Sequence, residues 1–251
     1  MLEDAAVDLV VTSPPYNLGI AYRRYFDRQQ RVDYLDWCQE WAAELRRLLK
    51  NHGSLFLNLG ASPSNPLLPH ELVLRLRDLF VLQNTIHWIK AISIEDDNGL
   101  TSSRGHFKPI SSQRYLNDCH EYIFHLTPEG RTPIDRLALG VPYADKSNIA
   151  RWSHTKGKDR RCRGNTWFVP YKTIQRRARE RPHPATFPVK LAEWCIKLHG
   201  PAGAGRIETM LDPFLGIGNS AVAAKRCGVK NFIGFEIDEE YLAEARKRAL
   251  L

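Results

Sequence analysis

The stretch "RIETMLDPFLGIGNSAVAAKRC" (206–227) joins an apolar run to a turn with two glycines and then to a run of small residues. This pattern predicts a strand at 206–214, a turn at Gly216 and Gly218, and a helix at 219–227. The first N–H groups of a helix that opens in this way are free to bind a ligand, and glycine lets the backbone approach that ligand closely.

A carboxylate follows the glycine turn at an informative spacing. Glu236 lies near the end of a predicted strand at 231–237, twenty residues after Gly216. An acid in this place accepts hydrogen bonds from the ribose hydroxyls of a nucleoside-containing cofactor, whereas the alternative is a tight turn followed by a solvated acid. Asp212 enters the turn from the strand, where it would repel a pyrophosphate and attract an ammonium group. The ligand is therefore expected to be S-adenosylmethionine rather than NAD.

Strands and helices alternate along most of the chain. Apolar periodicity predicts further strands at 7–11, 54–60, 82–90 and 121–126 and helices at 34–49, 67–80, 188–199 and 239–251, with "NHG" (51–53) ending the first helix. This alternation predicts an α/β fold with a mostly parallel, doubly wound sheet.

Two stretches interrupt the alternation. Residues 91–119 are polar and too long for an ordinary connection, so we expect a functional loop there. Residues 129–182 show little periodicity, and from Arg151 to Arg181 eleven Lys and Arg stand against two acids. The chain is therefore expected to form one α/β domain in two parts, 1–128 and 183–251, with a basic insertion at 129–182.

Composition limits the class of protein. The 251 residues contain 36 Lys and Arg against 28 Asp and Glu, a net charge of +8 that favours a polyanionic partner. Five scattered cysteines form no C-x-x-C pair, and Cys119, His120 and His125 lack zinc-site spacing, so neither a disulfide framework nor a metal is predicted. No apolar run reaches the length of a membrane span, and the N-terminus does not resemble a signal peptide. We expect a soluble, cytoplasmic protein.

The segment "VVTSPPYNLG" (10–19) ends the first predicted strand on two prolines. Pro14 and Pro15 stiffen the loop and leave its carbonyl oxygens free. The Ser13 hydroxyl and a backbone carbonyl can accept the two hydrogens of an exocyclic amino group while Tyr16 stacks on the ring. The alternative is a rigid turn with a packed tyrosine. Because this loop and the glycine turn both follow parallel strands, we expect them to meet at one edge of the sheet.

Four stretches in this order, "TSPPYN" (12–17), "HPATFPVKLAEWCI" (183–196), "DPFLGIGNSA" (212–221) and "GFEID" (234–238), resemble the β-class amino-methyltransferases of DNA. The resemblance implies a Rossmann-like methyltransferase fold, in which Ser13, Pro14, Pro15 and Tyr16 receive a base flipped out of the duplex. It also implies an S-adenosylmethionine pocket, formed by Asp212, Phe214, Gly216, Gly218, Asn219 and Glu236, with His183, Pro184 and Phe187 at its methionine end. The family usually has an earlier strand with a Gly-Asp pair, which this sequence does not show before Val7.

The resemblance also bears on the substrate. Family members whose first motif begins with serine mostly methylate cytosine N4 and those with aspartate usually adenine N6, so Ser13 favours cytosine. Methylation at cytosine C5 needs a cysteine nucleophile, and no Pro-Cys dipeptide occurs. An adenine N6 enzyme, a methyltransferase of RNA or of a protein amide, and a non-catalytic DNA-binding protein remain alternatives. A homodimer is one option for the assembly.

Basic residues are the candidates for DNA contact. Arginines interleaved with aromatic residues can hold phosphates and stack on bases, whereas the alternative is a solvated basic face. The candidates are Arg23, Arg24, Arg104, Lys108, Arg160, Arg161, Arg163, Arg176 and Arg177. The resemblance also implies that the basic insertion at 129–182, which contains five of these candidates, is the target-recognition part of the chain.

Overall fold

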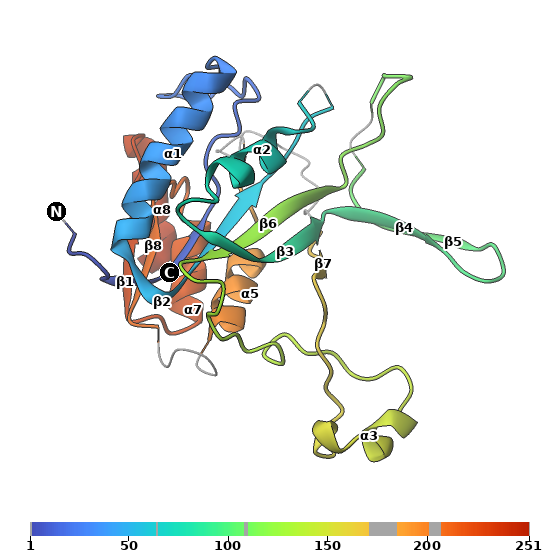
Figure 1. The fold of residues 1–251 in the computed structure, drawn as a ribbon. Coiled ribbons are helices and arrows are strands. Elements are labelled where there is room, and N and C mark those ends of the chain that lie inside the picture. Colours follow the sequence, from blue (N-terminus) through green and yellow to red (C-terminus); the bar gives the residue numbers. More distant parts are fainter. Residues whose placement is uncertain (1, 64, 108–109, 171–184, 201–206, 251) are drawn as a thin grey trace.

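The computed structural model describes residues 2–63, 65–107, 110–170, 185–200 and 207–250. Within them, seven strands form one sheet in the order β7-β3-β6-β2-β1-β8-β9, and two more form a separate hairpin (Figure 1). The strands are β1 (Val7–Thr12), β2 (Leu49–Leu59), β3 (Val81–Ile89), β4 (Ala91–Glu95), β5 (Thr101–Gly105), β6 (His120–Thr127), β7 (Thr166–Phe168), β8 (Thr209–Asp212) and β9 (Asn231–Gly234). The helices are α1 (Arg31–Leu48), α2 (Leu68–Arg75), α3 (Ser147–Arg151), the 3₁₀ helix η1 (Ser153–Thr155), α5 (Val189–His199), α7 (Asn219–Arg226) and α8 (Glu239–Leu250).

The sheet is mostly parallel, as predicted. β1 pairs in parallel with β2 and β8, β8 with β9, and β3 with β7. β6 is the exception, because it runs antiparallel to both of its neighbours, β2 and β3. Because β1 pairs with β8, the first strand of the chain and one of its last strands are neighbours inside the sheet.

Helices cover both faces of the sheet (Figure 1). On one face, α1 and α2 pack against a core that includes Val10, Leu55 and Leu57. On the other face, α5 and α7 pack against a core that includes Leu9 and Val11. Neighbouring residues of β1 thus enter opposite cores, which is the alternation expected of a strand buried on both sides.

Several predicted boundaries were wrong. "NHG" (51–53) does not end the first helix, because Leu49 already adopts an extended conformation (φ −77°, ψ 132°) and opens β2. The strand predicted at 206–214 is described only as Thr209–Asp212, and the one at 231–237 as Asn231–Gly234. Pro213 explains the first early end, since proline has no N–H to donate to the ladder. Shorter strands leave longer turns at this edge of the sheet.

The region predicted as a loop at 91–119 contains regular structure. Its first part forms the β4–β5 hairpin, which extends away from the sheet (Figure 1). The basic insertion also contributes to the sheet: β7 pairs with β3, and Trp167 is buried against Trp194 of α5 with ring centroids 5.5 Å apart. No helix in the described part of the chain has the length and apolar character needed to cross a bilayer.

Candidate active site

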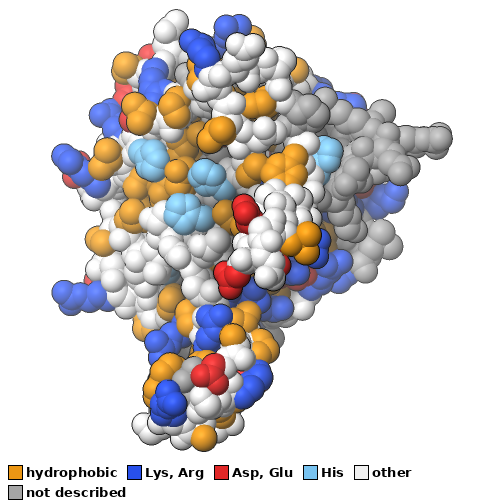
Figure 2. Space-filling view, turned by 90° about the vertical axis from the view of Figure 1, so that its right-hand side faces the viewer, with side chains coloured by type: hydrophobic (Ala, Val, Ile, Leu, Met, Phe, Trp, Pro, Cys, Tyr) orange, Lys and Arg blue, Asp and Glu red, His pale blue; other side chains and the backbone are white. Residues whose placement is uncertain are grey.

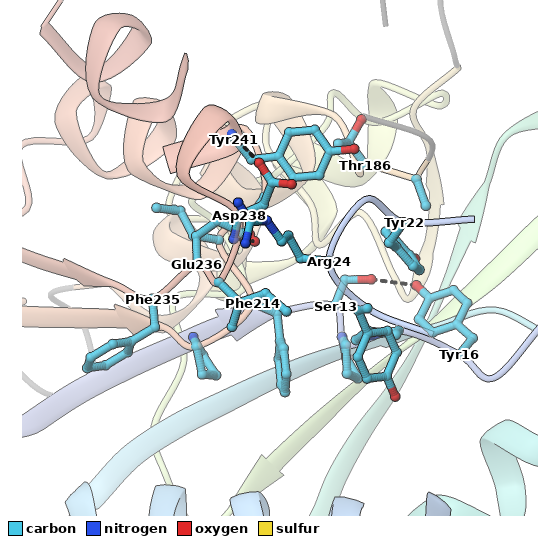
Figure 3. Close-up of a pocket in the computed structure, with 18 of the residues that line it drawn as sticks. Ser13, Tyr16, Tyr22, Arg24, Thr186, Phe214, Phe235, Glu236, Asp238 and Tyr241 are labelled. Carbon is cyan, nitrogen blue, oxygen red and sulfur yellow. Dashed lines mark hydrogen bonds between the residues drawn. The ribbon is translucent and has the colours of Figure 1, made fainter. Parts of the chain in front are cut away.

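One cavity of about 460 Å³ lies at the carboxyl ends of β1, β8 and β9. The loop after β1 contributes Ser13 to Tyr16, and the turns after β8 and β9 contribute Gly216 and Glu236. Figure 3 shows Ser13 and Tyr16 on one side of Phe214, with Glu236 toward the other. The two predicted motifs therefore share one cavity although about 200 residues separate them, because their strands are neighbours in the sheet.

Glu236 is held at the cavity by backbone N–H groups. Its Oε2 accepts a hydrogen bond from the N–H of Gly216 (2.8 Å), and its Oε1 accepts one from Asp238 (3.0 Å). Each carboxylate oxygen retains a lone pair for a ligand. The flanking side chains of Phe235 and Ile237 also line the cavity and are 53 % and 66 % exposed. A carboxylate can accept hydrogen bonds from ring hydroxyls, and the two apolar side chains beside it can pack on a flat ring. The arrangement therefore suits a ligand that joins a hydroxylated ring to a flat, more apolar ring.

Phe214 forms an aromatic wall together with helix α1. Its ring lies edge-on to Trp37, at 5.6 Å between centroids, and to Trp41, at 5.5 Å. Trp37 also lines the cavity. These contacts fix the Phe214 ring from behind, as edge-to-face packing of aromatic rings does in protein cores.

Asp212 lies behind the cavity rather than on its wall. The residue is fully buried, and its carboxylate accepts hydrogen bonds from the Thr12 hydroxyl (2.7 Å), the Ser220 hydroxyl and the N–H of Phe214 (3.1 Å). Burial raises the pKa of Asp212 to about 6, although these hydrogen bonds oppose the shift. The carboxylate thus ties β1 to β8 and α7, and its predicted contact with a cofactor ammonium group stays a prediction.

Gly218 and Asn219 shape the turn that enters α7. Gly218 adopts φ +80°, and a Cβ added there would lie 2.8 Å from the Cβ of Ala245. The close approach of α8 therefore requires glycine at this position. Gly218 is not among the residues that line the cavity. The Asn219 amide donates to the carbonyl of Phe187 (2.5 Å) and accepts from Arg248 (2.6 Å). Asn219 and Phe187, both on the cavity wall, are thereby linked.

The loop after β1 is fixed by side chains from other elements. The Tyr34 hydroxyl of α1 donates to the carbonyl of Pro15 (2.8 Å), and the hydroxyls of Ser13 and Tyr16 lie 2.6 Å apart. The Tyr16 ring packs so closely on Gly60 that a Cβ there would come within 2.9 Å of it. The rigid loop expected from the two prolines is thus supported from both sides.

A polar cluster behind Tyr16 was missed by sequence reasoning. The amide of Asn58 donates to the Tyr16 hydroxyl (2.6 Å) and to Oε2 of Glu121 (2.7 Å), while Lys90 donates to Oε1 of Glu121 (3.2 Å). Asn58 and Lys90 lie at the carboxyl ends of predicted strands, so the rule that singled out Ser13 would have found them too. Glu121 begins an antiparallel strand, which the sequence pattern did not show.

Comparison with known proteins identifies the family. The family model for DNA methylases of the N6/N4 type matches residues 7–247. The chain belongs to this family of DNA methylases. The assignment confirms the predicted methyltransferase fold and S-adenosylmethionine as the cofactor.

Individual relatives support the assignment, because their similarity extends over nearly the whole of this chain. The chain is 30 % identical to the type II methyltransferase M.ScaI of Streptomyces caespitosus over 94 % of its own length and 72 % of that protein. It is 26 % identical to the DNA adenine methyltransferase YhdJ of Escherichia coli K12, over 97 % of this chain and 76 % of that protein.

Two solved structures share the fold of this methylase. The cytosine-N4-specific PvuII DNA methyltransferase superposes with a TM-score of 0.65 at 18 % identity, covering 98 % of this chain and 80 % of the other. A DNA modification methylase from Thermus thermophilus, solved in complex with S-adenosyl-L-methionine, superposes with a TM-score of 0.61 at 23 % identity, covering 99 % and 87 %.

The segment after Tyr16 brings further side chains to the cavity of the methylase. The buried carboxylate of Asp27 accepts hydrogen bonds from the N–H groups of Asn17 (2.8 Å), Leu18 (3.1 Å) and Ile20 (3.2 Å), which closes the segment into a compact loop. This loop places Tyr22, Arg24 and Tyr25 on the cavity wall. Sequence reasoning found Arg24 through its charge but missed the two tyrosines, because they belong to no motif. Arg23 pairs instead with Glu240 of α8.

The predicted DNA-contacting arginines of the methylase fall into two groups. Arg160 donates to the carbonyls of Leu137 (2.6 Å) and Ala138 (2.8 Å). Arg163 donates to the carbonyl of Leu139 (3.0 Å), and its guanidinium lies 4.4 Å from the ring centroid of Trp194. Arg161 and Arg104 of β5 are exposed, and the described hydrogen bonds of their side chains go only to the carbonyl of an adjacent residue. Figure 2 shows Lys and Arg gathered on the lower lobe, which contains α3.

Five of the predicted site residues lie outside the described residues: His183, Pro184, Lys108, Arg176 and Arg177. Their roles stay predictions.

Proposed function

We propose that this methylase transfers a methyl group from S-adenosylmethionine to the N4 amino group of a cytosine flipped out of DNA. The observation that carries the proposal is the single cavity shared by Ser13, Tyr16 and Glu236. A donor held at Glu236 and an amino group held at Ser13 would face each other across that cavity, and such alignment lowers the barrier to transfer.

The cavity wall fits the cofactor. Glu236 would accept hydrogen bonds from the ribose hydroxyls, and Phe235 and Ile237 would enclose the adenine ring between their exposed side chains. The segment that ends at Phe187 would line the methionine end. The cofactor supplies a methyl group on a positively charged sulfur. The negative charge of Asp212 would stabilise that positive charge from behind the cavity wall. Asp212 would also act indirectly, because its hydrogen bond to the N–H of Phe214 fixes the position of that residue.

The Ser13–Tyr16 loop would activate the amino group. An aromatic amine is a weak nucleophile because its lone pair is delocalised into the ring. Ser13 Oγ and the carbonyl of Pro14 would accept the two hydrogens and so restore lone-pair character, while the Tyr16 ring would stack on the base. The N–C bond forms as the C–S bond breaks, and the amino proton leaves to solvent.

Cytosine N4 is proposed over adenine N6 because Ser13 stands first in the motif. The alternative, adenine N6, is supported by the 26 % identity to YhdJ, an adenine methyltransferase. We further propose residues 129–182 as the target-recognition region, on the basis of their positive charge.

One experiment tests both the reaction and the base. The protein is incubated with methyl-labelled S-adenosylmethionine and duplex DNA, and the DNA is digested to nucleosides for mass spectrometry. Labelled N4-methylcytosine is the expected product. Labelled N6-methyladenine would replace the proposal by its alternative, and label found on RNA but not on DNA would overturn both.

A further inference from the structure

The proposed reaction needs the Ser13 hydroxyl to accept a hydrogen bond, although a hydroxyl can equally well donate one. Which of the two it does depends on where its own hydrogen points. The Ser13 Oγ lies 2.6 Å from the Tyr16 hydroxyl (Figure 3), and that hydroxyl lies 3.2 Å from Oε2 of Glu121. Ser13 and Tyr16 line the cavity, whereas Glu121 is not among the described residues that line it. The three side chains therefore form a chain of hydrogen bonds that leads from the cavity wall to a carboxylate behind it.

The Glu121 end of this chain accepts hydrogen bonds and has none to give. Its Oε1 forms an ion pair with Lys90 (3.2 Å), and a carboxylate in such a pair carries lone pairs and no hydrogen. The amide nitrogen of Asn58 donates to Oε2 (2.7 Å), as a carboxylate oxygen requires of its neighbour. A hydrogen bond to a charged acceptor is roughly twice as strong as one between neutral groups, so the single hydrogen of the Tyr16 hydroxyl is directed to Glu121.

The direction at Ser13 follows from counting hydrogens. Because the Tyr16 hydrogen is directed to Glu121, the Tyr16 hydroxyl can only accept from Ser13. The Asn58 amide has two hydrogens, and its nearest acceptors are the Tyr16 hydroxyl (2.6 Å) and Glu121 (2.7 Å), with Ser13 Oγ farther away at 3.4 Å. The Ser13 hydrogen is thus committed to Tyr16. The lone pairs of Ser13 Oγ remain for a group that enters the cavity.

The opposite direction is unfavourable. If Tyr16 donated to Ser13, its oxygen and a carboxylate oxygen of Glu121 would face each other at 3.2 Å with no hydrogen between them. Both residues are at least partly buried, so water cannot readily screen that repulsion. Glu121 therefore decides which way the whole chain of hydrogen bonds runs.

We propose that Glu121 is a positioning residue that makes Ser13 an acceptor, and that the methylase thereby selects a base with an amino group over one with a carbonyl oxygen. An amino group offers its hydrogens to the lone pairs of Ser13, whereas a carbonyl oxygen would set its own lone pairs against them. Cytosine and adenine carry the amino group, and their counterparts uracil and hypoxanthine carry the oxygen. The inference rests on the proposed function and holds for either amino base.

Glu121→Gln changes the direction of the chain with little change in shape. The new amide oxygen would stay with Lys90, which can only donate, so the amide nitrogen would face the Tyr16 hydroxyl. A donor in that place no longer takes the Tyr16 hydrogen. Ser13 is then no longer held as an acceptor, and its hydrogen is free to turn toward the cavity.

The test compares two duplexes that differ only at the target base, which is located first by sequencing DNA that the wild-type protein has methylated. One duplex carries the amino base, and the other carries uracil in place of cytosine, or hypoxanthine in place of adenine. Fluorescence anisotropy with S-adenosylhomocysteine present measures both affinities. Their ratio, amino base over carbonyl base, should be roughly 5- to 30-fold lower for Glu121→Gln than for the wild-type protein, the effect of one misdirected hydrogen bond. Both proteins bind the same two duplexes, so differences in base pairing cancel.

A matched control is available at the opposite edge of the sheet. Asp8 is a buried carboxylate that pairs with Lys50 (2.6 Å) at the amino ends of β1 and β2. Asp8→Asn makes the same change from carboxylate to amide and should shift the ratio by less than about 2-fold. Thermal unfolding identifies any variant that fails to fold. If Glu121→Gln fails, Tyr16→Phe takes its place, because it removes the hydroxyl from the middle of the chain and keeps the ring, and the ratio should again fall.

Failure of the inference and failure of the proposed function can be told apart. If the wild-type protein methylates DNA but the ratio is the same in Glu121→Gln, or falls equally in Asp8→Asn, the role of Glu121 is wrong and the proposed function stands. If no methylated base forms in DNA, the proposed function is wrong and the inference falls with it.

Discussion

The cavity and the basic insertion use their polar side chains in opposite ways. In the cavity, Glu236 accepts hydrogen bonds from two backbone N–H groups and keeps further lone pairs available to a ligand. In the insertion, Arg160 and Arg163 direct their donors to nearby backbone carbonyls, and Arg163 also packs on Trp194. Charge in the cavity is thus arranged for a ligand, whereas part of the charge in the insertion maintains the fold. A high density of arginine therefore does not by itself identify the residues that contact DNA.

The largest effect is expected at Glu236. Glu236→Ala removes the charged acceptor proposed for two ribose hydroxyls, each worth about 1.5–3 kcal/mol, so cofactor affinity should fall at least about 100-fold. Isothermal titration calorimetry with S-adenosylmethionine measures it. Glu239→Ala, which removes an exposed acid at the start of α8, is the control and should bind normally. Equal affinity of both variants would contradict the assignment of the cavity.

A pH effect is expected at Asp212, behind the same cavity. Burial raises its pKa from 3.8 to about 6 in the folded protein, so the folded state binds this proton more tightly than the unfolded state does. The resulting stabilisation is present below pH 3.8 and is lost as the pH rises through about 6. The free energy of unfolding of the wild-type protein, minus that of Asp212→Asn, should therefore fall by about 2 kcal/mol between pH 4 and 7. Chemical denaturation at several pH values measures this difference, and a constant difference would refute it.

Tyr16→Ala separates the two sides of the cavity. Loss of stacking on the flipped base should lower kcat by roughly 10- to 100-fold, since base–aromatic stacking contributes about 1–3 kcal/mol. Cofactor affinity should change by less than about 3-fold, because Glu236 is untouched. Steady-state kinetics and calorimetry provide the two readings, and a loss confined to cofactor affinity would show that the roles were assigned to the wrong sides.

Within the insertion, Arg163→Ala should lower stability. The cation–π contact with Trp194 and the hydrogen bond to Leu139 together contribute about 1–2 kcal/mol, which corresponds to a fall of roughly 2–8 °C in Tm. Differential scanning calorimetry measures it. An unchanged Tm would mean that Arg163 is as available for DNA as its exposed neighbours.

Arg161→Ala should have the smallest effect and one of a different kind. The exposed side chain donates only to the adjacent carbonyl of Cys162, so the Tm should not change. If Arg161 contacts a phosphate, the slope of log affinity for DNA against log salt should decrease by about 1. Fluorescence anisotropy at several salt concentrations tests this, and an unchanged slope would remove Arg161 from the DNA interface.

The sequence predicted the parts of the site that depend on strand order. Ser13 and Glu236 could be placed in one cavity because parallel strands end at one edge, and this requires only that the strands be found. Glu121 was missed because apolar periodicity locates a strand without giving its direction. The β4–β5 hairpin was missed for another reason: it is exposed along most of its length, so its residues carry no buried face to reveal it. Tyr22 and Tyr25 reach the cavity because the hydrogen bonds of Asp27 fold the segment into a loop, and no residue spacing in the sequence predicts those hydrogen bonds.

The hydrogen bond between Thr12 and Asp212 has a consequence for the order of events during synthesis. These residues are 200 positions apart, and their strands pair in the middle of the sheet. A ribosome that has released α1, β2 and α2 has already produced the proline loop, but the wall opposite it does not yet exist. Because contacts so distant in sequence form late, the nascent chain cannot bind its methyl donor until the last strands and helices have emerged. The cofactor side of the cavity is thus complete only after β8, β9 and the turns that follow them have been synthesised.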